Sequence, residues 1–280
     1  MQLNRILLTG GSGLVGCTLA PMLRERYAVT HLDIQDPGDG LPFIKGNLRC
    51  LEEVADACKG IDAVVHVAAL HGGAWADQGD QMGFEVNVTG TKNILEGAAR
   101  AGVKRVVFTS SIWASGHGVP PPAYLPIDEE MQREPAELYG LTKLLGEQMC
   151  RYATAKYGIG TIVLRPGGIL PSENYAPTQS GFLTALVDVR DVATAHVLAL
   201  EAPREMMHEV FIITADSPLC RVAPPRVKED PAAALDSVVA GAGELVRNGD
   251  VTLAPDAEWY TIAKARRLLG YEPQFNFTLT

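Results

Sequence analysis

A tyrosine and a lysine four residues apart, in the run YGLTK that begins at Tyr139, could carry proton-transfer chemistry. Residues at positions i and i+4 lie on one face of a helix, so the phenol and the Lys143 ammonium group can point into the same cleft. A free phenol, with a pKa of about 10, is a poor base at neutral pH. A nearby cation stabilises the phenolate and lowers that pKa. The pair therefore predicts a general acid/base, although such pairs also arise by chance on many helices.

A serine at the end of an apolar run could hold the reacting oxygen. The run VVFTSS ends at Ser111. A hydroxyl group at the carboxyl end of a parallel strand can hydrogen-bond the carbonyl or alcohol oxygen of a substrate. Without Tyr139, the same serine would be an ordinary turn residue. We predict that Ser111, Tyr139 and Lys143 form one catalytic set.

Three glycines near the N-terminus stand between an apolar run and a helical pattern. Gly10 can form a tight turn, Gly13 lets the backbone approach a pyrophosphate, and Gly16 permits close packing of helix against strand. The exposed amides at the helix N-terminus, where Leu14 and Val15 stand, favour phosphate groups. The loop therefore predicts dinucleotide binding rather than a turn without a ligand.

Asp33 ends the second predicted strand, 17 residues after Gly16. An acid at about this distance binds the adenosine ribose hydroxyls in such folds. Its carboxylate would repel a 2′-phosphate, and no Arg or Lys follows before Lys45. These residues predict NAD rather than NADP, unless Asp33 only caps a turn.

Short apolar runs alternate with longer helical patterns over the first two-thirds of the chain. We predict strands at 5–9, 28–34, 63–68, 103–110, 160–164 and 209–214, helices at 13–26, 51–58, 88–101 and 139–157, and a short strand plus helix at 187–202. This alternation predicts an α/β fold with a Rossmann-type doubly wound parallel sheet. Residues 166–186, rich in Pro, Gly, Ser and Asn, predict irregular structure.

The expected division of the chain follows from this pattern. We expect an NAD-binding domain over residues 1–165, joined by elements from 187–215. Residues 166–280 are expected to form a smaller, mostly C-terminal substrate-binding lobe over the carboxyl ends of the strands.

The bulk composition limits the partners. A formal net charge of −9 disfavours nucleic acid and anionic membranes, which require a basic surface. Five scattered cysteines without Cys-x-x-Cys spacing indicate free thiols in a reducing compartment rather than disulfides or a metal site. No run of roughly 18 apolar residues and no signal-peptide pattern is found. We therefore expect a cytoplasmic protein.

Together these motifs resemble the extended short-chain dehydrogenase/reductase superfamily, and within it the NAD-dependent epimerase/dehydratase family. The resemblance covers residues 3–200 almost continuously. Further matching runs are HVAA from His66, NVTGT from Asn87, RPG from Arg165, VDVRDVA from Val187 and, near the end, KARRLLGY from Lys264.

The resemblance implies roles for the chemical residues. Tyr139 would be the general acid/base, Lys143 would tune it and bind the nicotinamide ribose, and Ser111 would hold the reacting hydroxyl. We interpret His66 as a packed residue at a strand end rather than a catalytic one. His117, in the loop after Ser111, is a candidate to reach the substrate.

The resemblance also implies cofactor contacts. Ala68 and Ala69 would border the adenosine side of the groove, and Asn87 would support the site near the nicotinamide. Asn47 and Leu48 stand where the family has Asp-Leu near the adenine, so an amide replaces a carboxylate there.

Departures from the family pattern narrow the reaction. Dehydratases of this family carry Asp and Glu directly after the catalytic hydroxyl residue, whereas this chain has Ile112 and Trp113, which cannot transfer that proton. A dehydratase is therefore disfavoured. Ser115 stands where epimerases often have Tyr.

The segment that grips the substrate is short, because only the 22 residues 166–187 separate Arg165 from Asp188. It is similar to the corresponding segment of uronate dehydrogenases and predicts a small ligand, unless residues 217–255 supply the missing binding surface. We expect dehydrogenation of a free sugar, uronate or polyol, with Ser111, Asn174 and Arg165 near the substrate and Arg165 also near the cofactor. The alternative is that Asn174 and Arg165 only tie down the loop.

Two other functions stay open. A sugar-nucleotide epimerase would retain its NAD, and a non-catalytic NAD sensor would not need the tyrosine–lysine pair. Many relatives pair the helices corresponding to 87–101 and 139–157 in a four-helix interface, so we expect a homodimer.

Overall fold

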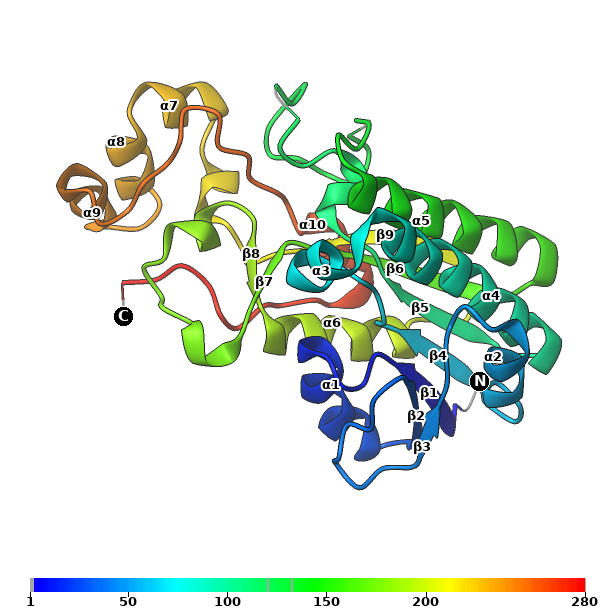
Figure 1. Cartoon of the computed structure of the whole chain (residues 1–280). Coiled ribbons are helices and arrows are strands. Elements are labelled where there is room, and N and C mark those ends of the chain that lie inside the picture. Colours follow the sequence, from blue (N-terminus) through cyan, green and yellow to red (C-terminus); the bar gives the residue numbers. More distant parts are fainter. Residues whose placement is uncertain (1–2, 120, 132, 280) are drawn as a thin grey trace.

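The computed structural model describes residues 3–119, 121–131 and 133–279. A seven-stranded, fully parallel sheet with the order β3-β2-β1-β4-β5-β6-β9 forms its centre (Figure 1). The strands are β1 (Arg5–Thr9), β2 (Ala28–Asp33), β3 (Phe43–Lys45), β4 (Ala63–His66), β5 (Arg105–Thr109), β6 (Gly160–Pro166) and β9 (His208–Ile213). The direction of winding reverses between β1 and β4, where open sheets of this kind bind ligands. The predicted Rossmann-type α/β fold is confirmed.

Helices cover both faces of the sheet. Successive strand residues point to opposite faces, so Ile6 and Leu8 belong to one core and Leu7 to the other. Both faces are buried, which explains why the strands are continuously apolar. One core is closed by α1 (Leu14–Arg24), α6 (Val189–Glu201) and α10 (Ala263–Leu269), the other by α2 (Leu51–Ala57), α4 (Gly90–Ala101) and α5 (Leu138–Tyr157).

Two elements of the Rossmann-type part were not predicted. Strand β3 has three residues, too few for a recognisable pattern. Helix α3 (Gly72–Phe84) has four glycines and kinks at Gly79, whose φ of 81° is open only to glycine. The predicted strand 63–68 ends at His66, which leaves the following residues as a loop over the sheet edge.

A smaller lobe lies beyond the end of the sheet, at the upper left of Figure 1. Its helices are α7 (Pro224–Glu229), α8 (Pro231–Asp236) and α9 (Ala242–Asn248). They surround a separate apolar core that includes Leu219, Leu235 and Trp259. Where irregular structure was expected, β7 (Gly168–Leu170) pairs in parallel with β8 (Leu186–Asp188), which follows later in the chain.

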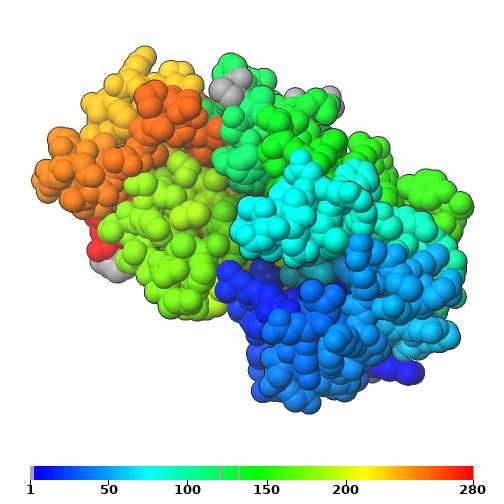
Figure 2. All heavy atoms as spheres, in the orientation of Figure 1, coloured from blue at the N-terminus to red at the C-terminus, as the bar shows by residue number. Residues whose placement is uncertain are grey.

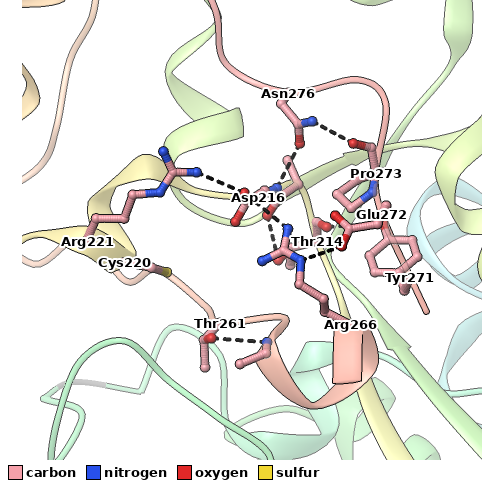
Figure 3. A network of polar contacts seen from close by, with 12 residues as sticks. Thr214, Asp216, Cys220, Arg221, Thr261, Arg266, Tyr271, Glu272, Pro273 and Asn276 are labelled. Atoms are coloured by element: carbon pink, nitrogen blue, oxygen red, sulfur yellow. Dashed lines mark hydrogen bonds and ion pairs between the residues drawn. The ribbon is translucent and has the colours of Figure 1, made fainter. Parts of the chain in front are cut away.

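A polar network ties the lobe to the end of β9 (Figure 3). The Asp216 carboxylate accepts contacts from Arg221 at 3.1 Å and from Arg266 of α10 at 3.2 Å. Arg266 also donates to Glu272 at 2.9 Å, and the Asn276 side chain accepts from the Asp216 amide at 2.8 Å. The C-terminal segment is thereby fixed against the residues that follow the last strand.

Candidate active site

A cavity of about 790 Å³ runs along the carboxyl ends of the central strands, between the glycine loop and the start of α5. Its size lies within the usual range of ligand pockets. Helix α3 borders it, and in Figure 2 the cyan residues of α3 lie between the blue N-terminal residues and the green residues that include α5. The predicted site residues in its lining are Gly10, Gly13, Leu14, Val15, Asp33, Asn47, Leu48, Ala68, Ala69, Ser111, Tyr139 and Lys143.

The glycine loop is shaped as a cradle. Gly10 has a φ of +74°, and a Cβ there would lie 2.6 Å from the Ala68 amide nitrogen. A Cβ at Gly16 would lie 2.1 Å from the Gly10 carbonyl oxygen, so Gly16 permits close approach of the helix to the loop itself rather than to the strand. A Cβ at Gly13 would meet no atom closer than 3.5 Å. Gly13 thus leaves free space at the cavity wall.

The N-terminus of α1 offers donors to an anion. Gly13 is the N-cap, and no side chain caps the helix. The first amides of a helix need a partner from outside, and the helix dipole favours a negative one. Leu14 and Val15 of this turn line the cavity. The donor set fits the pyrophosphate of a dinucleotide.

Asp33 lies at the end of β2 and is held rigidly. Its Oδ2 accepts from the Ser12 amide at 3.0 Å and the Ser12 hydroxyl at 2.9 Å, and its Oδ1 from the Ile34 amide at 2.7 Å. The carboxylate is 8% exposed and lines the cavity on the glycine-loop side. A fixed acid at this place fits the ribose hydroxyls of NAD.

The other end of the cavity brings together three predicted catalytic residues, Ser111, Tyr139 and Lys143. Ser111 follows β5 and caps a short 3-10 helix, while Tyr139 and Lys143 lie in the first two turns of α5. The Lys143 ammonium donates to the Thr109 carbonyl at 2.8 Å and lies 5.8 Å from the centre of the Tyr139 ring. Glu137 caps α5 by accepting from the amides of Tyr139 and Gly140, which fixes where the tyrosine begins the helix.

Burial has the largest effect on the pKa values of Tyr139 and Lys143. It raises the pKa of Tyr139 to about 12, although a hydrogen bond with Ser111 lowers it in part. Burial also lowers the pKa of Lys143 to about 8, against the raising effect of Glu147. Desolvation of the phenolate sets the direction of the Tyr139 pKa shift in the protein without NAD. That Lys143 and the positive nicotinamide ring together lower the phenol pKa stays a prediction.

Arg165 lies outside the cavity lining. Its guanidinium forms a bidentate pair with Glu147, with distances of 2.8 and 2.7 Å, and the Ser110 hydroxyl donates to the same carboxylate at 2.5 Å. Both side chains are nearly buried. Arg165 thus meets a partner on α5 rather than the space predicted for cofactor or substrate.

Three other predicted residues also stay outside the lining. The Asn87 side chain bonds both backbone groups of Leu70 and the Thr142 hydroxyl, so it fastens the loop after β4 to α5. Asn174 is exposed in a 3-10 turn. Gly16 packs against the glycine loop, where a Cβ would lie 2.1 Å from the Gly10 carbonyl oxygen.

The lining residues that were not predicted as contacts include His71, Trp75, Trp113 and Glu137. The Trp75 ring meets the Tyr139 ring edge-on with centres 6.0 Å apart, and the His71 ring lies 6.4 Å from it. Burial and the charge of Lys143 lower the pKa of His71. Apolar pattern alone could not find these residues, because α3 reads as a polar, glycine-rich stretch. The glutamate before Tyr139 is a capping signal that could have been recognised.

The two histidines discussed from the sequence, His66 and His117, lie in different surroundings, and the contact of His117 with substrate stays a prediction. His66 bonds Thr9 at 2.7 Å and Thr91 at 3.1 Å, and burial lowers its pKa to about 3, so it is a neutral core residue. His117 lines a second cavity. Of the positions where relatives differ, Ile112 is buried, Trp113 lines the main cavity and the Ser115 hydroxyl donates to the Ile112 carbonyl.

Two searches over the described residues gave no candidates. No group of His, Cys, Asp and Glu side chains is arranged to hold a metal ion. No helix combines the length and apolarity that crossing a bilayer demands.

Comparison with known proteins places the chain in a family. The sequence profile of the NAD dependent epimerase/dehydratase family matches residues 6–188. Because this is more than half of the chain, the protein belongs to that family, within the short-chain dehydrogenase/reductase superfamily. The predicted family is confirmed, and with it NAD as the cofactor.

Individual relatives differ in activity. A 3-beta-hydroxysteroid dehydrogenase from Mycolicibacterium neoaurum is 35% identical over 180 residues, 60% of this chain and 48% of that protein. A uronate dehydrogenase from Pseudomonas syringae pv. tomato is 32% identical over 186 residues, 65% of each chain. This chain thus spans less than half the length of the steroid dehydrogenase.

The same fold is found in a solved structure. A short-chain dehydrogenase/reductase superfamily protein from Agrobacterium tumefaciens, solved with bound NAD, superposes with a TM-score of 0.73. The superposition covers 98% of this chain and 94% of that one at 24% identity. The similarity shows a common fold.

Proposed function

We propose that this chain is an NAD-dependent oxidoreductase that transfers a hydride at a hydroxyl or carbonyl carbon of a sugar, uronate or polyol-like substrate. The observation that carries the proposal is one cavity with a pyrophosphate cradle and Asp33 at one end, and Ser111, Tyr139 and Lys143 at the other. Gly10, Gly13 and the amides of α1 would hold the dinucleotide.

The chemistry of the substrate end follows from its side chains. When bound, NAD accepts a hydride from a carbinol carbon, or in reduced form returns one to a carbonyl carbon. The Ser111 hydroxyl would hydrogen-bond the reacting oxygen. The Tyr139 oxygen would take up the hydroxyl proton in oxidation and give it back in reduction. Oxidation thus removes one hydride and one proton and leaves a C=O bond, while Lys143 supplies positive charge beside the phenol.

Removing the phenol oxygen tests this role. With sugars, uronates and polyols as substrates, Tyr139→Phe should lower kcat for NADH formation by about 10²-fold or more, because general acid/base transfer is lost. The affinity for NAD, measured by titration calorimetry, should stay near the wild-type value. Tyr124→Phe, at an exposed tyrosine outside the lining of both cavities, is the matched control. An unchanged kcat in Tyr139→Phe would contradict the proposal and favour an NAD sensor.

The family also contains epimerases, and the same preparation distinguishes them. An epimerase returns the hydride to the opposite face of the sugar and therefore forms no net NADH. NAD that copurifies with the protein, together with interconversion of UDP-sugars and no NADH, would favour a sugar-nucleotide epimerase.

We also infer a cytoplasmic homodimer. Five free cysteines support a reducing compartment. The dimer is supported by the family resemblance and by Leu141, Tyr152 and Tyr157 of α5, which leave 39 to 55% of their surface exposed. Light scattering of the purified chain tests the oligomeric state.

A further inference from the structure

A second cavity, of about 370 Å³, opens between the loop after Ser111 and the C-terminal lobe. Its walls combine hydroxyl groups, two carboxylates and small residues. They are His117, Gly118, Ser180, Gly181, Thr184, Ala185, Thr252, Ala254, Asp256, Ala257 and Glu258.

This cavity adjoins the substrate end of the main one at two shared walls. The Trp113 ring lines the main cavity and meets the His117 ring edge-on, with centres 5.1 Å apart. Gly168 also lines the main cavity, and its amide donates to the carbonyl of Ala185, which lines the second. The two cavities therefore lie next to each other across these contacts.

The charges facing this space are negative. Asp256 and Glu258 belong to the lining, and the Glu258 carboxylate contacts the His117 ring at 3.1 Å. Within residues 3–119, 121–131 and 133–279, Lys143 is the one Lys or Arg that lines either cavity. Its ammonium is bound to the Thr109 carbonyl at 2.8 Å and lies between the rings of Phe108 and Tyr139.

The arginines around the cleft already have carboxylate partners. Arg133 forms a nearly buried pair with Glu258, Arg165 with Glu147, and Arg190 with Asp188. A carboxylate at the substrate end of this cleft would lose its hydration without gaining an unpaired Lys or Arg of the described residues. It would also approach the Asp256 carboxylate, whereas the charge of Glu258 is balanced by Arg133.

We propose that the substrate is uncharged: a neutral polyhydroxy compound whose far end enters the second cavity, where Ser180, Thr184, Thr252 and the two carboxylates accept or donate hydrogen bonds. Uronates would be poorer substrates than the corresponding neutral sugars, because their carboxylate would approach Asp256. This inference rests on the proposed function and names its substrate class. It separates this chain from the uronate dehydrogenases to which it is similar.

Matched substrate pairs test the charge directly. We would measure kcat/KM for NADH formation by the full-length protein with glucose against glucuronate, galactose against galacturonate, and glucitol against gluconate. The uncharged member should exceed the acid by about tenfold or more in every pair that reacts. A higher kcat/KM for the acid would overturn this inference and leave the proposed function standing. NADH from no member of any pair would overturn the proposed function, and this inference with it.

A charge-reversal variant locates the effect in the second cavity. Asp256→Lys should raise the ratio of uronate to aldose kcat/KM about tenfold, because it replaces a repelling charge by an attracting one. Asp250→Lys changes the net charge equally on an exposed residue of the same lobe outside the lining, and should leave the ratio unchanged. Equal ratios in the two variants would overturn the assignment of this cavity.

Discussion

At the scale of single residues, the catalytic end depends on a buried cation. Lys143 is 3% exposed, and its ammonium donates to one carbonyl, that of Thr109. Glu147, one turn further along α5, supplies the opposing charge but is itself paired with Arg165. The low pKa of Lys143, about 8, means that the folded protein holds its proton less tightly than the unfolded chain. The charge that the chemistry needs therefore costs folding stability at neutral pH.

Replacing Lys143 by Met should consequently stabilise the fold while abolishing NADH formation. A fall in pKa from 10.5 to about 8 corresponds to about 3 kcal/mol, and the loss of the Thr109 hydrogen bond offsets about 1 kcal/mol. The cost is fully present below pH 8 and disappears as the pH rises toward 10.5. Urea denaturation should show the variant about 2 kcal/mol more stable at pH 7 and no more stable than wild type at pH 10. A difference independent of pH would contradict this account.

A site residue could be predicted from the sequence where local structure, rather than a distant partner, determines its position. The glycines, Asp33 and Tyr139 were placed from local spacing, because a turn and a helix face are determined within a few residues. The pairing of Arg165 was not predicted, because its partner, Glu147, lies 18 residues away and on another element. A strand end reveals that a side chain is near the edge of the sheet, but not which neighbour it meets.

At the scale of elements, the loop between β1 and α1 contains one glycine needed for folding and another that we expect to matter for cofactor binding. Gly16 faces the carbonyl of Gly10, whereas Gly13 faces the cavity. A methyl group at Gly16 would clash with the Gly10 carbonyl oxygen. A methyl group at Gly13 would clash with no protein atom, but it would take up cavity space that we propose for the pyrophosphate.

Two alanine variants should therefore behave differently. Gly16→Ala should lower the free energy of unfolding by about 1–3 kcal/mol, because its Cβ would lie 2.1 Å from the Gly10 oxygen. Gly13→Ala should change stability by less than about 1 kcal/mol but weaken NAD binding about tenfold or more. Thermal unfolding and NAD titration measure the two effects. An intact NAD affinity in Gly13→Ala would show that the loop does not cradle the phosphates.

Helix α3 shows why some elements escape sequence-based prediction. Its residues are mostly exposed, and four glycines lower its intrinsic propensity, so neither periodicity nor composition indicates a helix. Trp75 nevertheless reaches Tyr139, and a Cβ at Gly83 would lie 2.4 Å from the Trp75 ring. This helix is positioned by a few tertiary contacts rather than by an apolar stripe.

At the scale of the whole molecule, the chain crosses between its two parts several times. Residues 187–213 return from the lobe side to supply α6 and β9, and α10 packs against the main core before Phe277 returns to the core of the lobe. We propose that the lobe is the substrate-binding part. One of the contacts between the lobe and the rest of the chain is the ion pair of Arg133 with Glu258, whose positions in the sequence lie 125 residues apart. Sequence spacing cannot reveal such a pair.

The Arg133–Glu258 pair should hold the lobe to the Rossmann-type part. Burial alone would raise the pKa of Glu258, but hydrogen bonds from His117 and Arg133 and the charge of Arg133 hold it at about 2, below the usual 4.5. A carboxyl group with a lowered pKa stabilises the fold above pH 4.5, and this contribution is lost as the pH falls toward 2. The stabilising effect should therefore be complete at pH 7 and partly lost at pH 3.5.

A double-mutant cycle measures this coupling. Glu258→Gln or Arg133→Met alone should each destabilise the protein by about 3–5 kcal/mol at pH 7, because one buried polar partner remains uncompensated. The double variant should lose less than the sum of the two single losses, since it buries no lone charge. The coupling energy from urea denaturation should shrink between pH 7 and pH 3.5 as Glu258 becomes easier to protonate in the unfolded chain. Strictly additive losses would mean that the lobe is held by its apolar contacts, and that the second cavity keeps its shape without this ion pair.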